Sequence, residues 1–224
     1  MRTITADGYA IIADVLPPGR VDQLLDDLSP AGAPRSRAGL RHALRYAAAR
    51  ALAGDPRLTD LARGALGGDA FPFRATLFDK SEKANWLVVW HQDTALPLRD
   101  RHDHPAWGPW SVKHGVIYAH APATALSRVL ALRVHLDDSL FENGPLRVLP
   151  GTHTRGVLRD EEIHECAERI SPAECLVGKG GVVAMRPLII HASSKSRSDL
   201  PRRVLHIEYA ESREIADGFE LAIA

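Results

Sequence analysis

The hydrophobic pattern changes character after Gly67-Gly68. Beyond that point the chain becomes a series of short apolar segments separated by Gly, Pro, Asn and Asp. The segments are residues 71–78, 85–90, 129–136, 146–149, 182–185, 188–191 and 204–209. Many short strands bounded by turn residues are typical of a sandwich or a barrel. The pattern predicts a jelly roll for this part of the chain.

The preceding residues show helical periodicity instead, apart from a short strand expected at residues 8–12. Apolar side chains recur at helical spacing from Val21 to Leu28, and we expect this helix to begin at Pro18 or Gly19. Residues 40–66 are rich in Ala, Leu and Arg and poor in β-branched residues. They predict a second helical stretch, interrupted near Gly54-Asp55-Pro56 because proline breaks a helix interior.

Taken together, these patterns predict a mainly β fold with flanking α. We expect one domain over residues 1–224, since β barrels of this length commonly form single units. Residues 1–67 are then largely helical support packed outside, and residues 68–212 form the jelly-roll core.

Composition narrows the class of protein. Lys+Arg and Asp+Glu both number 28, so the net charge is zero and indicates neither nucleic acid nor an anionic membrane as partner. No apolar run approaches the roughly 18 residues of a transmembrane helix, and the N-terminus lacks the layout of a signal peptide. We interpret Cys166 and Cys175 as reduced thiols of a cytoplasmic protein. No pattern predicts the oligomeric state.

Three residues indicate a metal centre. His91 and Asp93 stand in the sequence Trp-His-Gln-Asp, and His191 closes a later apolar segment. Alternate side chains of a strand share a face, so His91 and Asp93 can point to one metal while Gln92 points away. Two imidazoles and one carboxylate form the facial triad that binds non-haem Fe(II) and leaves open positions for oxygen chemistry. A lone His-x-Asp can arise by chance in a chain with 11 histidines, so the metal-site prediction also depends on the later segments around His191 and Arg202.

A pair of arginines follows the second histidine. Arg202 comes 11 residues after His191 (202 − 191), and Arg203 is adjacent. A guanidinium binds a carboxylate in a bidentate manner, which suits a carboxylate co-substrate. Because neighbouring residues of a strand face opposite sides, only one of the two arginines can point inward.

The chain resembles the phytanoyl-CoA dioxygenase (PhyH-like) family of Fe(II)/2-oxoglutarate oxygenases over roughly residues 78–209. The resemblance rests on Phe78-Asp79-Lys80, Asn85-Trp86, Trp90-His91-Gln92-Asp93, Trp107-Gly108-Pro109-Trp110-Ser111-Val112-Lys113, His135-Leu136-Asp137-Asp138, Glu142-Asn143-Gly144-Pro145-Leu146, Pro150-Gly151-Thr152-His153, His191-Ala192-Ser193-Ser194 and Pro201-Arg202-Arg203. Several independent matches in the right order are far more specific than any single one.

The resemblance implies a double-stranded β-helix (a cupin-like jelly roll) and an oxygenase that uses Fe(II), 2-oxoglutarate and O2. It implies iron held by His91, Asp93 and His191, and 2-oxoglutarate held by an arginine, for which the family spacing favours Arg202. Halogenating relatives lack the carboxylate ligand. Since Asp93 is retained here, the resemblance favours hydroxylation or a related oxidation. No motif identifies the substrate.

Weaker candidates surround these residues. Asn85 shares the face of His91 and can reach the co-substrate or simply begin a strand. Trp107 and Trp110 can close the substrate pocket or pack in a core. His135 can touch substrate or be a hydrogen-bonded core histidine. The long polar stretch 98–110 can form a lid, and its acidic and histidine-rich residues 100–104 can alternatively be read as a second metal site.

Two other functions stay compatible with the sequence. One is a cupin-like metalloenzyme that keeps the triad and does not use 2-oxoglutarate, so that it would not need Arg202. The other is a non-catalytic barrel that uses its pocket for binding or sensing.

Overall fold

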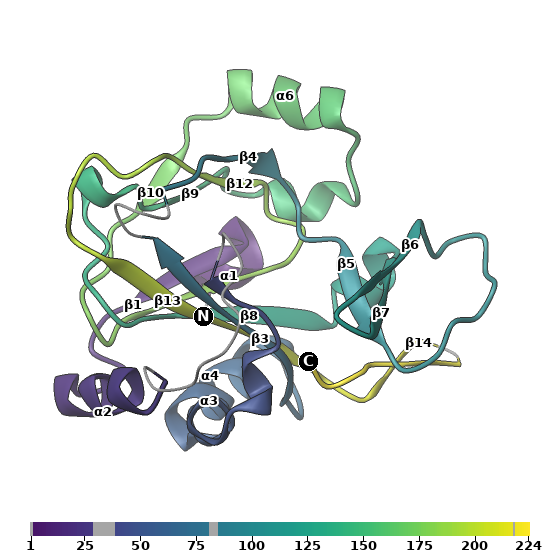
Figure 1. Cartoon of the computed structure of the whole chain (residues 1–224). Helices are drawn as coiled ribbons and strands as arrows, with labels where there is room; N and C mark the ends of the chain where they lie inside the picture. The colour runs from purple at the N-terminus through teal and green to yellow at the C-terminus, as the bar shows by residue number, and fades with distance from the viewer. Residues whose placement is uncertain (1, 29–38, 81–84, 217) are drawn as a thin grey trace.

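The computed structural model describes residues 2–28, 39–80, 85–216 and 218–224. Two antiparallel sheets dominate it (Figure 1). The larger sheet has six strands in the order β1-β11-β8-β13-β3-β2. Its strands are β1 (Tyr9–Ile12), β11 (Val182–Met185), β8 (Val129–His135), β13 (Arg202–Ala210), β3 (Phe71–Lys80) and β2 (Gly39–Leu40). The facing sheet has four strands in the order β10-β9-β12-β4, namely β10 (Ala173–Cys175), β9 (Leu146–Val148), β12 (His191–Ser193) and β4 (Val88–His91). These two sheets form the predicted jelly roll.

The helices of the N-terminal part cover the outer face of the large sheet (Figure 1). They are α2 (Pro18–Leu28), α3 (Ala47–Ala53) and α4 (Pro56–Leu66), with the short helix η1 (Ala43–Arg45) before α3. The largest buried apolar cluster joins them to the sheet through Leu130, Leu132, Val134, Leu205, Ile207 and Tyr209 on the strands and Val21, Leu24, Leu52 and Leu58 on the helices. The prediction that helices pack outside the jelly roll is confirmed.

The predicted break in the second helical stretch lies at Asp55. Its side chain accepts a hydrogen bond from the backbone N–H of Arg57 at 2.9 Å, and Pro56 takes the first helical position of α4. An aspartate cap followed by proline is a strong helix start. The N-terminal part is nevertheless more than helical support, because β1 and β2 form the two edges of the large sheet.

The inner face of the large sheet is unusually polar. Alternation along β3, β8 and β13 turns inward Arg74, Thr76, Phe78, Arg133, Arg202, His206 and Glu208, all of which line one cavity. Intervening residues of the same strands are apolar and pack in the cluster shared with the helices, namely Ala75, Leu77, Leu130, Leu132, Val134, Leu205, Ile207 and Tyr209. The fold therefore places titratable side chains inside the barrel, where burial makes unpaired charges costly.

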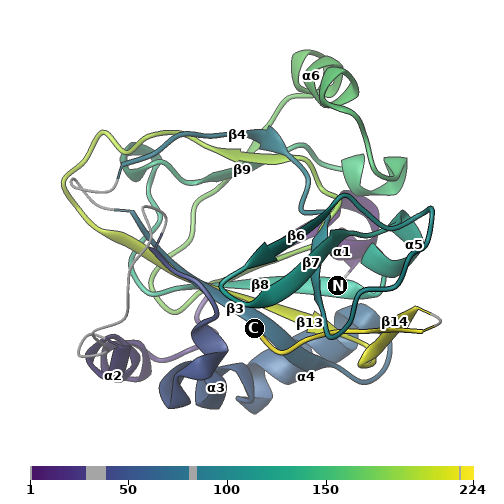
Figure 2. The same ribbon diagram turned by 45° about the vertical axis from the view of Figure 1, so that its right-hand side comes forward.

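A third sheet lies beside the two main sheets (Figure 2). It has three strands in the order β5-β7-β6, formed by β5 (Ala95–Leu98), β7 (Val116–His120) and β6 (Trp110–Lys113). The sequence pattern did not predict these strands. Further elements are α1 (Arg2–Asp7), α5 (Ala123–Leu126), η2 (Phe141–Asn143), η3 (Thr152–Arg155), α6 (Asp160–Arg169), β14 (Glu214–Ala216) and β15 (Phe219–Glu220). Among the described residues, no helix is long and apolar enough to cross a membrane.

One predicted strand is wrong. Residues 188–190 form a turn after Pro187, in which the N–H of Ile189 donates to the carbonyl of Arg186 at 3.1 Å, and the strand begins only at His191. The three apolar side chains of this turn are buried in three different clusters. This short apolar run is thus apolar because its side chains are buried in different directions, and not because it pairs with a neighbouring strand.

Candidate metal centre

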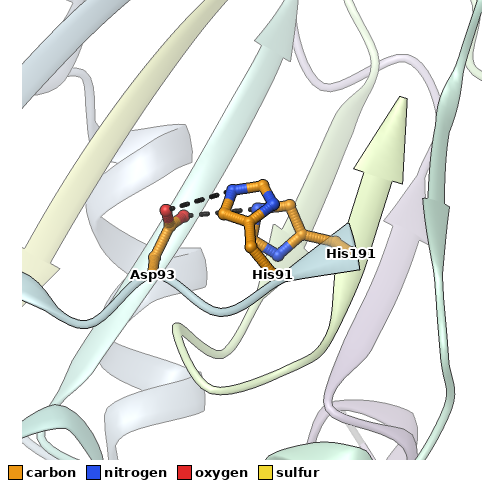
Figure 3. Close-up of side chains that lie close together, drawn as sticks. All are labelled: His91, Asp93 and His191. Carbon is orange, nitrogen blue, oxygen red and sulfur yellow. Dashed lines mark ion pairs between the residues drawn. The ribbon is translucent and has the colours of Figure 1, made fainter. Parts of the chain in front are cut away.

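The two candidate ligand histidines are neighbours across one strand pair. His91 is the last residue of β4, His191 is the first of β12, and the two are paired in register. Their ring centroids lie 4.2 Å apart. Asp93 follows two residues after His91, just beyond the strand, and its carboxylate faces both rings (Figure 3). The structure thus brings together three residues that the sequence separates.

Each histidine is oriented by its own backbone. The Nδ1 atoms of His91 and His191 lie 2.8 and 2.9 Å from the carbonyl oxygens of Val89 and Ile189. A proton on Nδ1 donated to that carbonyl leaves the lone pair on Nε2, which is the tautomer that a metal ligand needs. The Nε2 atoms lie 3.8 and 3.5 Å from the carboxylate of Asp93. Potential ligand atoms of all three residues lie within 4.8 Å of one another.

The protonation states also suit a cation. Burial lowers the pKa of His191 to about 4, against the attraction of Asp93, so the imidazole is neutral at pH 7. Burial by itself would raise the pKa of Asp93, but His191, His206 and His91 together hold it well below the usual range. A neutral imidazole and an ionised carboxylate are the forms that bind metal, and they need lose no proton at neutral pH.

Gln92 fixes the short segment between the ligands. Its Nε2 donates to the carbonyls of Gly156 at 2.9 Å and Leu188 at 2.7 Å, and its Oε1 accepts from the N–H of Leu158 at 2.8 Å. The buried amide therefore ties the segment to two loops while the flanking side chains face the metal site. The sequence predicted only that Gln92 points away from the metal.

The two arginines that sequence reasoning could not separate have different surroundings. Arg203 forms a bidentate ion pair with Asp137, with Nε–Oδ2 and Nη2–Oδ1 distances of 2.8 and 2.7 Å. Arg202 faces the cavity, is only 4% exposed and has no carboxylate partner within the described part of the chain. Its Nε donates to the carbonyl of Asn143 and its Nη2 to the hydroxyl of Ser193, both at 3.2 Å. Its buried Nη1 has no hydrogen-bond partner among the described residues.

Other polar groups of the cavity were missed. Arg133 lines it with a buried, unpartnered Nε, and its Nη1 lies 3.2 Å from Nδ1 of His206. Behind the wall, Lys80 donates to the hydroxyl of Ser193 at 3.0 Å, and burial together with Arg202 and Arg133 lowers its pKa to about 7. The sequence did contain an indication of these cavity residues, because Arg133 and His206 interrupt segments that are otherwise apolar.

The cavity itself has a volume of about 360 Å³. This is within the usual range for small-molecule sites, near its lower end. Besides the triad it includes the buried pair of Arg74 and Glu208, in which the guanidinium binds the carboxylate through two nitrogens. Among the described residues, the triad is the only cluster with metal-ligand character, so residues 100–104 do not form a second one.

The weaker candidates lie elsewhere. Asn85 pairs through its amide with the backbone of Ser196, at 2.8 and 2.7 Å, and does not line the cavity. Trp107 is buried and stacks on Phe219 with ring centroids 4.1 Å apart. Trp110 packs partly buried against the same apolar cluster. The predicted co-substrate role of Asn85 and the predicted pocket role of the two tryptophans find no support in these positions.

His135 is fully buried, and neither ring nitrogen has a hydrogen-bond partner among the described residues. Burial, Arg133 and Arg202 lower its pKa to about 3, so the ring is neutral. It does not line the cavity. The stretch 98–110, expected to be a lid, also contributes nothing to the cavity wall, whereas the hairpin that follows it contributes Lys113, Tyr118 and His120.

Comparison with known proteins assigns the class. The family model for phytanoyl-CoA dioxygenase (PhyH) matches residues 4–204, and the chain belongs to this family. L-proline trans-4-hydroxylase of Streptomyces griseoviridis is 29% identical over 182 residues, which cover 69% of this chain and 59% of that protein. A phytanoyl-CoA dioxygenase domain-containing protein of Mus musculus is 28% identical over 119 residues, covering 44% and 40%. The chain thus spans between two fifths and three fifths of these relatives.

Solved structures share the fold. AviO1 from Streptomyces viridochromogenes superposes with a TM-score of 0.69 at 21% identity, covering 93% of this chain and 92% of that one. The non-haem α-ketoglutarate-dependent carbocyclase SnoK from nogalamycin biosynthesis superposes with a TM-score of 0.73 at 18% identity, covering 95% and 83%. At such identities the likeness establishes the jelly-roll fold and leaves the substrate open.

Proposed function

We propose that this protein is an Fe(II)- and 2-oxoglutarate-dependent dioxygenase that hydroxylates or otherwise oxidises a small molecule. The observation that carries the proposal is the position of the triad and a buried, unpaired arginine on the wall of one cavity. His91, Asp93 and His191 would hold the iron. When bound, iron and 2-oxoglutarate supply oxygen activation, coupled to decarboxylation of the co-substrate to succinate.

Arg202 fits the distal carboxylate of 2-oxoglutarate. Its guanidinium is buried and uses Nε and Nη2 on neutral acceptors, so its positive charge lacks a counter-ion among the residues that the structure describes. Burial and the nearby Arg133 lower the pKa of Arg202 to about 9, which expresses the cost of that charge. A carboxylate that meets Nη1 would satisfy the free nitrogen and offset the charge at once.

Two alternative functions compete with this proposal. A metalloenzyme that does not use 2-oxoglutarate would need the metal-binding triad but not the buried Arg202. A non-catalytic binding protein would need neither the triad nor a buried arginine. The destabilising burial of Arg202 without a counter-ion therefore favours a carboxylate co-substrate. The family match supports the same proposal, as does the α-ketoglutarate-dependent carbocyclase SnoK, which shares the fold. We also propose a cytoplasmic location, which the two free, buried cysteines suit.

A titration of the anaerobic Fe(II) protein with 2-oxoglutarate tests the function directly. We expect a weak visible charge-transfer band that saturates with one co-substrate per chain. Iron binding without this band would favour the metalloenzyme that does not use 2-oxoglutarate. Failure to bind iron would favour the binding protein.

Arg133 is expected to bind the co-substrate carboxylate that lies next to the metal. Burial lowers the pKa of Arg133 while Asp93 raises it, and Arg133 in turn helps to lower the pKa of His191. Arg202 instead hydrogen-bonds to Asn143 and Ser193. Of the two arginines Arg133 and Arg202, Arg133 is thus the one that acts electrostatically on the triad. Oxalate chelates a metal and has no distal carboxylate, so it probes this contact alone. In the Mn(II) protein, Arg133→Gln is expected to weaken oxalate binding roughly 10- to 100-fold, as for loss of a charge-assisted hydrogen bond.

Calorimetry of the parent and two variants checks this expectation. Arg202→Gln serves as the matched control, since it removes the same charge from the same cavity and should leave oxalate binding within about twofold. Equal oxalate affinity in the parent and in Arg133→Gln would show that Arg133 does not contact the metal-side carboxylate.

A further inference from the structure

Two exposed cationic side chains line the cavity, one beside the edge strand β2 of the large sheet and one on the third sheet. Arg41 follows β2, and Lys113 ends β6. The two elements meet at the next residues, since the rings of His42 and His114 contact each other edge to face with centroids 5.7 Å apart. Neither cation has a carboxylate partner among the residues that the structure describes. We call the part of the cavity wall formed by Arg41 and Lys113 the cationic mouth.

The backbone at the cationic mouth is strained. His42 and His114 adopt φ values of 54° and 49°, in the left-handed region that residues with side chains rarely occupy. Both follow directly after one of the two cations, and the two rings touch. Strained residues of this kind cluster at binding and catalytic sites, where the surrounding structure holds them. Packing supports the arrangement, because Nε2 of His42 lies 3.0 Å from the hydroxyl of the buried Tyr118.

The cations of this region repel one another. Burial, Arg41 and Arg74 lower the pKa of Lys113, and its Nζ sits 5.1 Å from the ring centroid of Tyr118 rather than on a carboxylate. Burial, Arg45, His114 and Arg41 likewise lower the pKa of His42. The mouth therefore has a positive potential that no acidic side chain of the cavity wall compensates locally.

The charge balance of the whole cavity leads to the same result. Among the described residues, five cations and two carboxylates line it: Arg41, Arg74, Lys113, Arg133 and Arg202 against Asp93 and Glu208. Because Glu208 already pairs with Arg74, it is not free to neutralise the mouth. A divalent metal and a dianionic co-substrate would cancel each other. Loading the site would thus leave the positive excess in place for another anion.

We propose that the substrate carries a carboxylate or a phosphate group, which Arg41 and Lys113 bind at the cationic mouth. This inference rests on the proposed function and adds the substrate class to it. An anion held there would leave the remainder of a small molecule to extend toward the triad within a cavity of about 360 Å³. Positive potential at a cavity mouth also attracts such a substrate from solution.

Paramagnetic relaxation tests the anion site without knowledge of the substrate. The protein is loaded with Mn(II) and excess 2-oxoglutarate, so that the co-substrate cations are occupied. Inorganic phosphate and acetate are then added separately, and the relaxation of phosphorus or of the methyl protons is measured. We expect enhancement by the bound Mn(II) and a loss of about tenfold or more in the double variant Arg41→Gln/Lys113→Gln. A response to phosphate alone assigns a phosphate group, and a response to acetate alone assigns a carboxylate.

The control is the double variant Arg63→Gln/Arg169→Gln, which removes the same charge from exposed positions off the cavity wall. An undiminished enhancement in the mouth variant, or an equal loss in the control, would overturn the proposal. So would the absence of any enhancement in a protein that binds Mn(II) and 2-oxoglutarate. Failure to bind 2-oxoglutarate at all would instead contradict the proposed function. In a second assay, a library of acids paired with their neutral amides should stimulate 2-oxoglutarate turnover only through the acids.

Discussion

Replacing His91 with alanine is expected to abolish tight iron binding. The side chain supplies one of three protein ligands, and its Nε2 faces Asp93 at 3.8 Å. Loss of groups that merely orient ligands costs about 10- to 100-fold in metal affinity, so loss of a ligand should cost at least roughly 100-fold. Anaerobic equilibrium dialysis with Fe(II) measures the effect. Because His91 is 37% exposed, its truncation leaves little cavity and should preserve the fold.

His164→Ala is the matched control for this experiment. His164 is 76% exposed on α6 and pairs only with Glu168, so its removal should leave iron binding unchanged. Circular dichroism and the melting temperature should be close to those of the parent in both variants. If the folded His91→Ala protein bound iron as tightly as the parent, the assignment of the triad would be wrong.

The second large effect is expected for Arg202→Gln. Loss of a buried, charge-assisted contact to the distal carboxylate costs about 2–5 kcal/mol, or a roughly 30-fold to several-thousand-fold rise in the 2-oxoglutarate dissociation constant. Iron binding should remain nearly intact, since Arg202 does not contact the triad. The variant also removes an uncompensated buried charge, so the free energy of unfolding of the apo protein should not fall strongly. Calorimetric titration of the Mn(II) protein measures the affinity.

Arg203→Gln provides the neighbouring control. Arg203 pairs with Asp137 and is partly exposed, so its loss should change stability by no more than about 1 kcal/mol and leave 2-oxoglutarate binding unaffected. Should Arg203→Gln lose the co-substrate while Arg202→Gln retains it, the inward-facing arginine would have been misassigned.

Strand periodicity accounts for what could be predicted. Along β13 the inner residues Arg202, His206 and Glu208 alternate with apolar residues that pack on the helices, and a period of two is visible in the sequence. The same alternation placed His91 and Asp93 on one side of Gln92. What the pattern could not supply is the partner of each strand, so the direct pairing of His91 with His191 required the structure.

The failures have a different physical origin. Trp107 and Trp110 are large apolar residues in a polar stretch. Nothing local indicates that Trp107 stacks on Phe219, near the C-terminus, or that Trp110 packs against the same cluster. The strands of the third sheet escaped detection because β6 is largely exposed and β5 contains a proline. As a result, sequence reasoning did not find Lys113, Tyr118 and His120, the residues of the β6-β7 hairpin that line the cavity.

The pairing of His91 with His191 has a mechanical consequence. β4 is an edge strand of the smaller sheet and is hydrogen-bonded there only to β12, with an irregularity between His191 and Ser193. A metal held by both histidines would act as a cross-link that fastens this edge. Metal binding by both histidines and local fraying of β4 would then exclude each other, so metal binding would lower the population of the frayed state. Amide hydrogens of β4 should exchange more slowly once metal is bound, which makes this strand a built-in reporter of metal loading.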